Sequence, residues 1–158
     1  MELTKRHYFA LAAMRVSLGM LMVWWGLHRV LTPEKGMGIQ KKFYAELFPS
    51  VDLQYAFGYL QLTVGLLVVL GLFRKVAVPA QLIICGFSSI MILPALLDPF
   101  GLWLPMDRLS PIQHFFYPSV IAMAAGVFLF TARNYDKYCL DRLLFRQPAV
   151  VKEMATAV

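Results

Sequence analysis

The chain has 158 residues, of which 59% are hydrophobic and 15% are charged, and its formal net charge is +6. This length suits about one domain, but so apolar a composition excludes an ordinary water-soluble globule. The sequence holds no nucleic-acid-binding motif, so we assign the positive charge to membrane topology and to anionic lipid headgroups, with no nucleic acid as partner.

Apolar residues gather in four blocks, at residues 8–27, 53–73, 76–97 and 115–131. Each block has about 17 to 22 residues, near the length that an α-helix needs to cross a hydrocarbon layer of about 30 Å. The first block is not read as a signal peptide, because it carries Arg15 and lacks a small-residue cleavage site. The pattern predicts an all-α protein, an integral membrane four-helix bundle that forms a single domain over residues 1–146.

The distribution of cations predicts the orientation of this bundle. With four spans, one side holds the larger group of cations, which are Lys5, Arg6, Arg74, Lys75, Arg133, Lys137, Arg142, Arg146 and Lys152. The opposite side holds fewer cations, balanced by acids. The positive-inside rule therefore predicts that both termini lie in the cytoplasm and that the protein is a multi-pass protein of the bacterial inner membrane.

Short polar segments join and follow the spans. Ile39, Phe43 and Leu47 recur at helical spacing, which predicts a short amphipathic helix on the outer surface. Residues 133–146 carry cations on one face and leucines on another, which predicts a cytoplasmic amphipathic helix lying on the membrane. Residues 147–158 are predicted to be a disordered tail.

Each predicted span has one stripe of small and polar residues, and small residues are what allow helices to pack closely in lipid. Gly19 and Gly26 share a face of the first span, and Gly58 and Gly65 share a face of the second. We therefore expect these four glycines to serve helix packing and the stripes to face inward together.

Arg15 is the most informative of the polar residues, because an arginine within a span needs a partner or a water-filled pocket. Gln61 and Gln81 reach a similar depth, so we expect a hydrogen-bonded cluster of Arg15, Gln61 and Gln81. Two interpretations stay open. The cluster clamps three helices and nothing else, or it forms a polar pocket for a quinone or a lipid headgroup.

Arg29 lies on the same side of the first span as Arg15, so it is predicted to point into the mouth of the bundle and to join the pocket. His28 falls about 140° from that direction and is predicted to face lipid headgroups or a partner. A metal or haem site shared by His28 and His114 is conceivable, but it lacks a third ligand at a recognisable spacing, and we predict no metal site.

The two cysteines, Cys85 and Cys139, fall at different depths and are not expected to pair. The sequence also lacks a dinucleotide fingerprint, a C-x-x-C-H haem motif and a metal motif. We therefore predict no catalytic residues and no intrinsic cofactor.

Three segments resemble the DoxX family of small four-helix bacterial membrane proteins, which is related to the small subunit of thiosulfate:quinone oxidoreductase. They are "MRVSLGMLMVWWGLHRVLTP", "FGYLQLTVGLLVVLGLFRKVA" and "KYCLDRLL". The resemblance places Arg15, Gly19, Gly26 and Arg29 in the first motif and Cys139-Leu140-Asp141 where the family has Ser-Leu-Asp. Gln61 stands where the family usually has glutamate, so an ion pair with an arginine would become a neutral hydrogen bond.

The resemblance implies a non-catalytic subunit or anchor of a quinone-linked membrane oxidoreductase, with the redox groups on a partner subunit and a quinone as the ligand. Two alternatives remain. One is a small transporter or lipid-handling protein whose polar stripes line a pathway, and the other is a structural assembly factor.

Overall fold

The computed structural model describes residues 4–43, 50–91, 93, 97 and 117–144. This part of the chain is mostly helical and contains no strand, so the predicted all-α class is confirmed. The helices are α1 (Lys5–Leu31), α2 (Pro33–Phe43), α3 (Val51–Leu70), α4 (Arg74–Met91), α6 (Tyr117–Thr131) and α7 (Leu140–Leu144).

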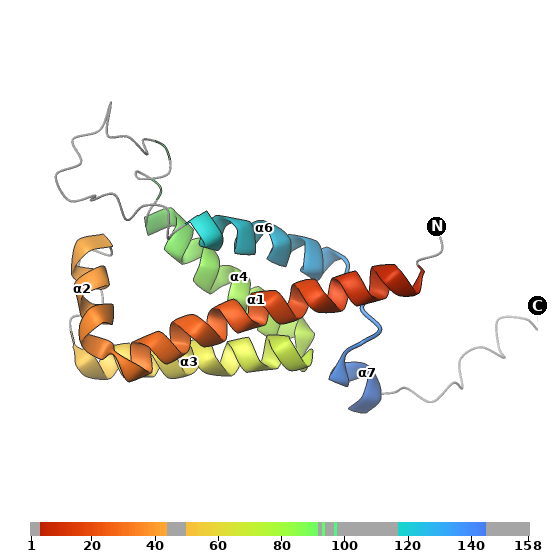
Figure 1. Ribbon diagram of the computed structural model, residues 1–158, viewed down its shortest axis with the longest axis horizontal. Coiled ribbons are helices and arrows are strands. Elements are labelled where there is room, and N and C mark those ends of the chain that lie inside the picture. Colours follow the sequence, from red (N-terminus) through yellow and green to blue (C-terminus); the bar gives the residue numbers. More distant parts are fainter. Residues whose placement is uncertain (1–3, 44–49, 92, 94–96, 98–116, 145–158) are drawn as a thin grey trace, which may run out of the picture.

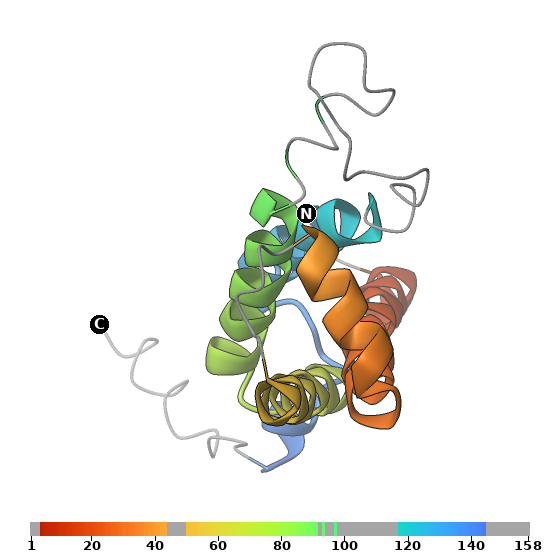
Figure 2. The ribbon, with the colours of Figure 1, turned by 90° about the vertical axis from the view of Figure 1, so that its left-hand side faces the viewer.

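The four long helices alternate in direction along the bundle (Figure 1). α1 packs along α3, and α4 packs along α6, while α3 and α4 are joined by a tight turn. The end-on view in Figure 2 shows α3 and α4 beside each other, with α2 crossing the end of the bundle. The start of α1 and the short helix α7 lie at the same end, opposite α2 (Figure 1).

The turn between α3 and α4 depends on one glycine. Gly71 ends α3 in the left-handed region at φ 67°, and the backbone N–H of Leu72 donates to the carbonyl of Leu67 at 2.9 Å. This is the usual way in which a helix stops and its last carbonyls are satisfied. The chain then enters α4 at Arg74, so α3 and α4 form an antiparallel hairpin.

The helical segments between and after the long helices differ in part from the prediction. α2 is helical, but it begins at Pro33, whose missing N–H suits the first position of a helix. The predicted helix over residues 133–146 begins later than expected, because residues 132–139 form turns and irregular backbone. Leu140–Leu144 is helical, and residues 145 and 146 lie outside the described part of the chain. The predicted disordered tail, residues 147–158, lies outside the described residues.

Two helices, α1 and α3, are long and apolar enough to cross a membrane, and Pro118–Thr131 is a shorter apolar helix. The surface of the bundle is also apolar. Large hydrophobic side chains point outward from every long helix, including Trp24, Leu66, Ile83, Ile90 and Ile121. Such a surface is typical of a protein that faces lipid or another protein.

The interior, by contrast, contains polar groups. The apolar core is built around Met22, Val64, Val68, Ala77 and Ala122. Polar and charged side chains are buried beside it, which are Arg15, Arg29, Gln54, Gln61, Gln81, Ser89 and Asp136. Buried polar groups of this kind need partners, so they are the natural candidates for function.

Candidate functional site

The contact between α1 and α3 is made by two pairs of glycines. A Cβ added to Gly19 would lie 2.8 Å from the carbonyl oxygen of Gly65, and one added to Gly26 would lie 2.8 Å from that of Gly58. Both distances are too short for a side chain, so the two backbones touch directly. This contact lies between Arg15, which precedes Gly19 in α1, and Arg29, which follows Gly26.

Arg15 is 4% exposed, and all three of its guanidinium nitrogens donate hydrogen bonds. Nε donates to Oδ2 of Asp136 at 2.8 Å, and Nη2 donates to the carbonyl of Tyr138 at 2.6 Å. Nη1 donates to the carbonyls of Val68, at 2.9 Å, and Val69. These carbonyls are the last of α3, where the helix dipole is negative, so the cation is matched both by a carboxylate and by a helix end.

A second ion pair extends this contact to α4. Asp141 accepts hydrogen bonds from the backbone N–H groups of Phe73 and Arg74, at 2.8 and 3.0 Å, and from Nε of Arg74 at 3.2 Å. Nη1 of Arg74 also donates to the carbonyl of Arg133 at 2.7 Å and lies 3.8 Å from Oδ2 of Asp136. Arg15, Arg74, Asp136 and Asp141 thus form one set of contacts, which we call the Arg15 network.

The hydrogen bonds of Asp141 also set its acidity. Partial burial raises the pKa of the Asp141 carboxyl, but the N–H groups of Arg74 and Phe73 and the side chain of Arg74 outweigh this effect and hold the pKa below its ordinary value. The carboxylate is therefore the form that fastens α7 to the turn between α3 and α4.

The Arg15 network replaces the hydrogen-bonded cluster of Arg15, Gln61 and Gln81 that we expected from the sequence. The guanidinium of Arg15 bonds to the last turn of α3 and to the segment after α6. The expectation failed because residues 132–139, expected to be a surface helix, instead fold under the bundle and present Asp136, which is 2% exposed.

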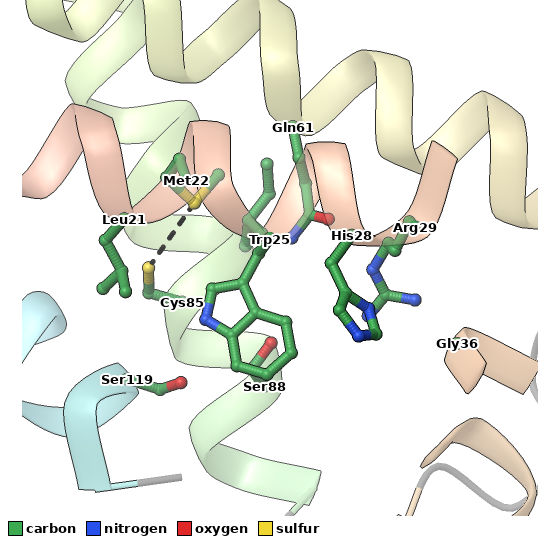
Figure 3. Close-up of a pocket in the computed structure, with 11 residues that line it drawn as sticks. Leu21, Met22, Trp25, His28, Arg29, Gly36, Gln61, Cys85, Ser88 and Ser119 are labelled. Atoms are coloured by element: carbon green, nitrogen blue, oxygen red, sulfur yellow. Dashed lines mark hydrogen bonds between the residues drawn. The ribbon is translucent and has the colours of Figure 1, made fainter. Parts of the chain in front are cut away.

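A cavity lies between α1, α3, α4 and α6, in the half of the bundle that does not contain the Arg15 network (Figure 3). Its volume is about 40 Å³, which is room for about three waters or one polar group of a ligand. We call it the His28 cavity. Its lining is Leu21, Met22, Trp25, His28, Arg29, Gly36, Gln61, Ile84, Cys85, Ser88 and Ser119.

Several lining groups can form hydrogen bonds. Figure 3 shows the side chains of Trp25, His28, Gln61 and Ser88 converging on this space from three helices. Oε1 of Gln61 and Nδ1 of His28 are buried and have no hydrogen-bond partner within the described chain. The His28 ring packs edge-on against Trp25, with 6.0 Å between ring centroids. The cavity therefore offers an indole, an amide, an imidazole and a hydroxyl to a polar group.

Arg29 lies at the edge of the His28 cavity. Its Nη1 donates to Oε1 of Gln54 at 2.8 Å, and its guanidinium lies 4.9 Å from the centre of the Phe57 ring. Arg29 is 7% exposed, and Gln54 is fully buried. This pair therefore joins α1 to α3 beyond the contact of Gly26 with Gly58, on the side of α2. The predicted inward position of Arg29 agrees with this geometry.

The structure corrects the position of His28, which was predicted to face lipid headgroups or a partner and instead lines the cavity. The angle measured from Arg15 misled the prediction, because α4 and α6 approach α1 on a different side from α3. His114, the other residue of the conceivable metal or haem site, lies outside the described residues. Within the part of the chain that the structure describes, no group of three or more His, Cys, Asp or Glu residues could hold a metal ion.

Gln81 does not line the His28 cavity. It is fully buried in α4, and neither its amide oxygen nor its amide nitrogen has a hydrogen-bond partner among the described residues. The predicted pocket residues therefore divide into separate places, with Arg15 at one end of the bundle, Gln61 and Arg29 at the cavity, and Gln81 between helices.

Sequence reasoning missed Asp136, Trp25, Cys85 and Ser88 as site residues. Asp136 could have been found, because a buried arginine needs a counter-ion and few acids lie in the segments predicted to share its end of the bundle. Cys85 and Ser88 follow Gln81 at i+4 and i+7 on one face of α4, which is the signal that could have found them. Cys85 lies beside Met22, with 4.0 Å between the two sulfur atoms, and both cysteines are free and buried.

Comparison of the chain with protein-family models, with curated proteins and with solved structures finds no match in any of the three.

Proposed function

We propose that this chain is a membrane-embedded helical bundle that serves as a non-catalytic subunit or anchor of a quinone-linked oxidoreductase. In this proposal the long helices α1, α3, α4 and α6 span the inner membrane and both termini face the cytoplasm. The outward apolar side chains and the buried polar ones support the membrane placement.

One observation carries the ligand half of the proposal. Oε1 of Gln61 is buried, unpartnered within the described chain and faces the His28 cavity. A buried amide in this state is satisfied by water or by a ligand. Oε1 itself accepts a hydrogen bond, so it matches the hydroxyl of a quinol, whereas the indole N–H of Trp25, the hydroxyl of Ser88 and the amide N–H of Gln61 can donate to a quinone carbonyl.

The size of the His28 cavity limits how a quinone would bind. A volume of about 40 Å³ admits one carbonyl end of the ring and not the whole headgroup. The ring would then lie toward the lipid, with one oxygen at Gln61. The redox groups that exchange electrons with it belong, in this proposal, to a partner subunit.

The alternative of a small transporter has less support from the geometry. The Arg15 network joins α1, the turn between α3 and α4, and α7 at one end of the bundle. A polar pathway from the His28 cavity would have to pass this buried ion pair. A ligand site that does not continue through the bundle suits an anchor or accessory subunit better than a transporter.

Quinone binding tests the ligand half of the proposal. The purified protein in mild detergent is titrated with a short-chain quinone, and binding is followed by quenching of tryptophan fluorescence, since Trp25 lines the cavity. Gln61→Leu should weaken binding by about tenfold, the worth of one hydrogen bond to the ligand. Gln81→Leu is the matched control, because it removes a buried amide that does not line the cavity, and it should bind as the wild type does. Equal affinity of the wild type and Gln61→Leu would contradict the site.

Co-purification tests the subunit half. The protein is extracted from native membranes in mild detergent, and the proteins that accompany it are identified by mass spectrometry. We expect a redox subunit that carries a flavin, a haem or an iron–sulfur cluster. A bundle that emerges with bulk lipid alone would overturn the assignment as an oxidoreductase subunit.

A further inference from the structure

A second and larger hollow lies at the opposite end of the bundle from the His28 cavity, between the first turns of α1 and the last turn of α6. Its volume is about 510 Å³, within the range of small-molecule sites. We call it the α1–α6 groove. Its lining is His7, Ala10, Leu11, Met14, Phe128, Thr131, Ala132 and Tyr135.

The polarity of the α1–α6 groove changes along its length. Leu11, Met14 and Phe128 line the part nearer the middle of the bundle and are apolar. His7 and Tyr135 line the part nearer the start of α1, where the helix begins and α6 has ended. A molecule that fits this groove is therefore apolar along most of its length and polar at one end.

The polar end of the groove is also positively charged. Lys5 and Arg6 occupy the first turn of α1, and Nζ of Lys137 lies 4.2 Å from the centre of the Tyr8 ring, next to His7. Nδ1 of His7 accepts a hydrogen bond from the backbone N–H of Thr4 at 3.2 Å, so a neutral ring carries its proton on Nε2 and can donate there.

Asp136 is the described acid next to the polar end of the groove, and its carboxylate does not neutralise the cations there. Asp136 precedes Lys137, but it is 2% exposed and paired with Arg15. The cations around the mouth therefore stay uncompensated by that carboxylate, and the mouth attracts an anion.

We propose that the α1–α6 groove binds an anionic phospholipid of the cytoplasmic leaflet. One acyl chain lies along Leu11, Met14 and Phe128, and the phosphate lies at the mouth near His7 and Lys137. A partner helix would be a poorer match, because it would need an apolar contact along the whole groove and none of the charge at one end. This proposal rests on the membrane placement in the proposed function, but not on the quinone or on the His28 cavity.

The test measures which lipids stay with the protein. The full-length protein is reconstituted in vesicles of phosphatidylethanolamine and phosphatidylglycerol, re-extracted in mild detergent, and its bound lipids are counted by native mass spectrometry. The wild type should retain phosphatidylglycerol in preference to phosphatidylethanolamine.

Two pairs of variants locate the binding site. Ala10→Trp fills the groove and should release the retained lipid, whereas Ala13→Trp, at an exposed alanine outside the lining, should not. Lys137→Gln should lower the preference for phosphatidylglycerol by about fivefold, the worth of one lysine near an anionic surface. Lys75→Gln removes a cation at the turn between α3 and α4 and should leave the preference unchanged.

The outcomes separate this proposal from the proposed function. A wild type that does not enter the vesicles overturns the membrane placement and the groove together. A wild type that enters them, with equal lipid retention in Ala10→Trp and Ala13→Trp, overturns only the groove. If Ala10→Trp loses helicity or thermal stability, Lys137→Gln decides, because an unchanged lipid preference in that variant also overturns the proposal.

Discussion

Nε of Arg15 donates a 2.8 Å hydrogen bond to Oδ2 of Asp136, and 121 residues of chain separate the two. The pair joins the first helix to the segment that follows the last long helix, and both side chains are almost fully buried. Removal of one buried partner leaves the other charge uncompensated, which costs more than the pair itself contributes.

Asp136→Ala should therefore destabilise the bundle by about 3–5 kcal/mol. The free energy of unfolding can be measured by titration with a denaturing detergent. The double variant Arg15→Met with Asp136→Ala should be less destabilised than Asp136→Ala alone, because no charge is left without a partner. If Asp136→Ala lowered the free energy of unfolding by less than about 0.5 kcal/mol, as surface substitutions do, the buried ion pair would be contradicted.

The glycine contact between α1 and α3 makes a second prediction. A Cβ added to Gly65 would lie 2.8 Å from the backbone nitrogen of Val23, so Gly65→Ala should force the helices apart at a cost of about 1–3 kcal/mol. Gly86→Ala is the matched control in α4, because its added Cβ meets only the sulfur of Met123, at 3.8 Å. Equal thermal unfolding midpoints for the two variants would show that the contact is looser than described.

Gly71 links the end of α3 to the segment before α7. Gly71→Ala should strain a backbone with φ 67°, at about 1–2 kcal/mol, and its Cβ would lie 2.7 Å from Cβ of Cys139. Cys139, which is 4% exposed, should then react faster with a thiol reagent, as mapped by mass spectrometry of the labelled peptide. Gly38→Ala is the control, since nothing lies within 4 Å of its added Cβ. Unchanged labelling of Cys139 in Gly71→Ala would argue against this contact.

Asp141 makes the attachment of α7 dependent on pH. Its pKa in the folded protein lies below the ordinary value of 3.8, so its contribution to stability is present above about pH 4 and is lost as the pH falls through the folded pKa. Thermal unfolding measured from about pH 6 to about pH 3 should show this loss in the wild type and less of it in Asp141→Asn. Asp52→Asn removes an exposed carboxylate at the other end of the bundle and should retain the loss. An identical pH profile for the wild type and Asp141→Asn would rule out the role of Asp141.

The sequence was a good guide to the helices and a poor guide to the partners of Arg15. The apolar blocks located α1, α3, α4 and α6, because length and hydrophobicity act locally along the chain. The stripe of glycines on α1 and α3 likewise reflects a contact between two neighbouring helices. These features depend on the residues of one or two segments only.

The features that were predicted wrongly depend on how distant segments meet. A similar depth in the predicted spans is the only reason to expect hydrogen bonds from Arg15 to Gln61 and Gln81. The fold of residues 132–139 decides the actual partners of Arg15. His28 was judged by its angle from Arg15, which says nothing about the side on which α4 and α6 approach. A helical wheel gives directions within a helix, and the identity of the neighbour in each direction is a tertiary property.

The contact between Arg15 and Asp136 also has a consequence for the order of synthesis. Arg15 lies in α1, which leaves the ribosome before α3, α4 and α6, and Asp136 follows α6. If α1 inserts in the membrane as proposed, its arginine carries a cost of about 2.5–3.5 kcal/mol until the rest of the chain arrives. A nascent or truncated product that stops before residue 136 keeps that uncompensated charge, which distinguishes it physically from a finished molecule.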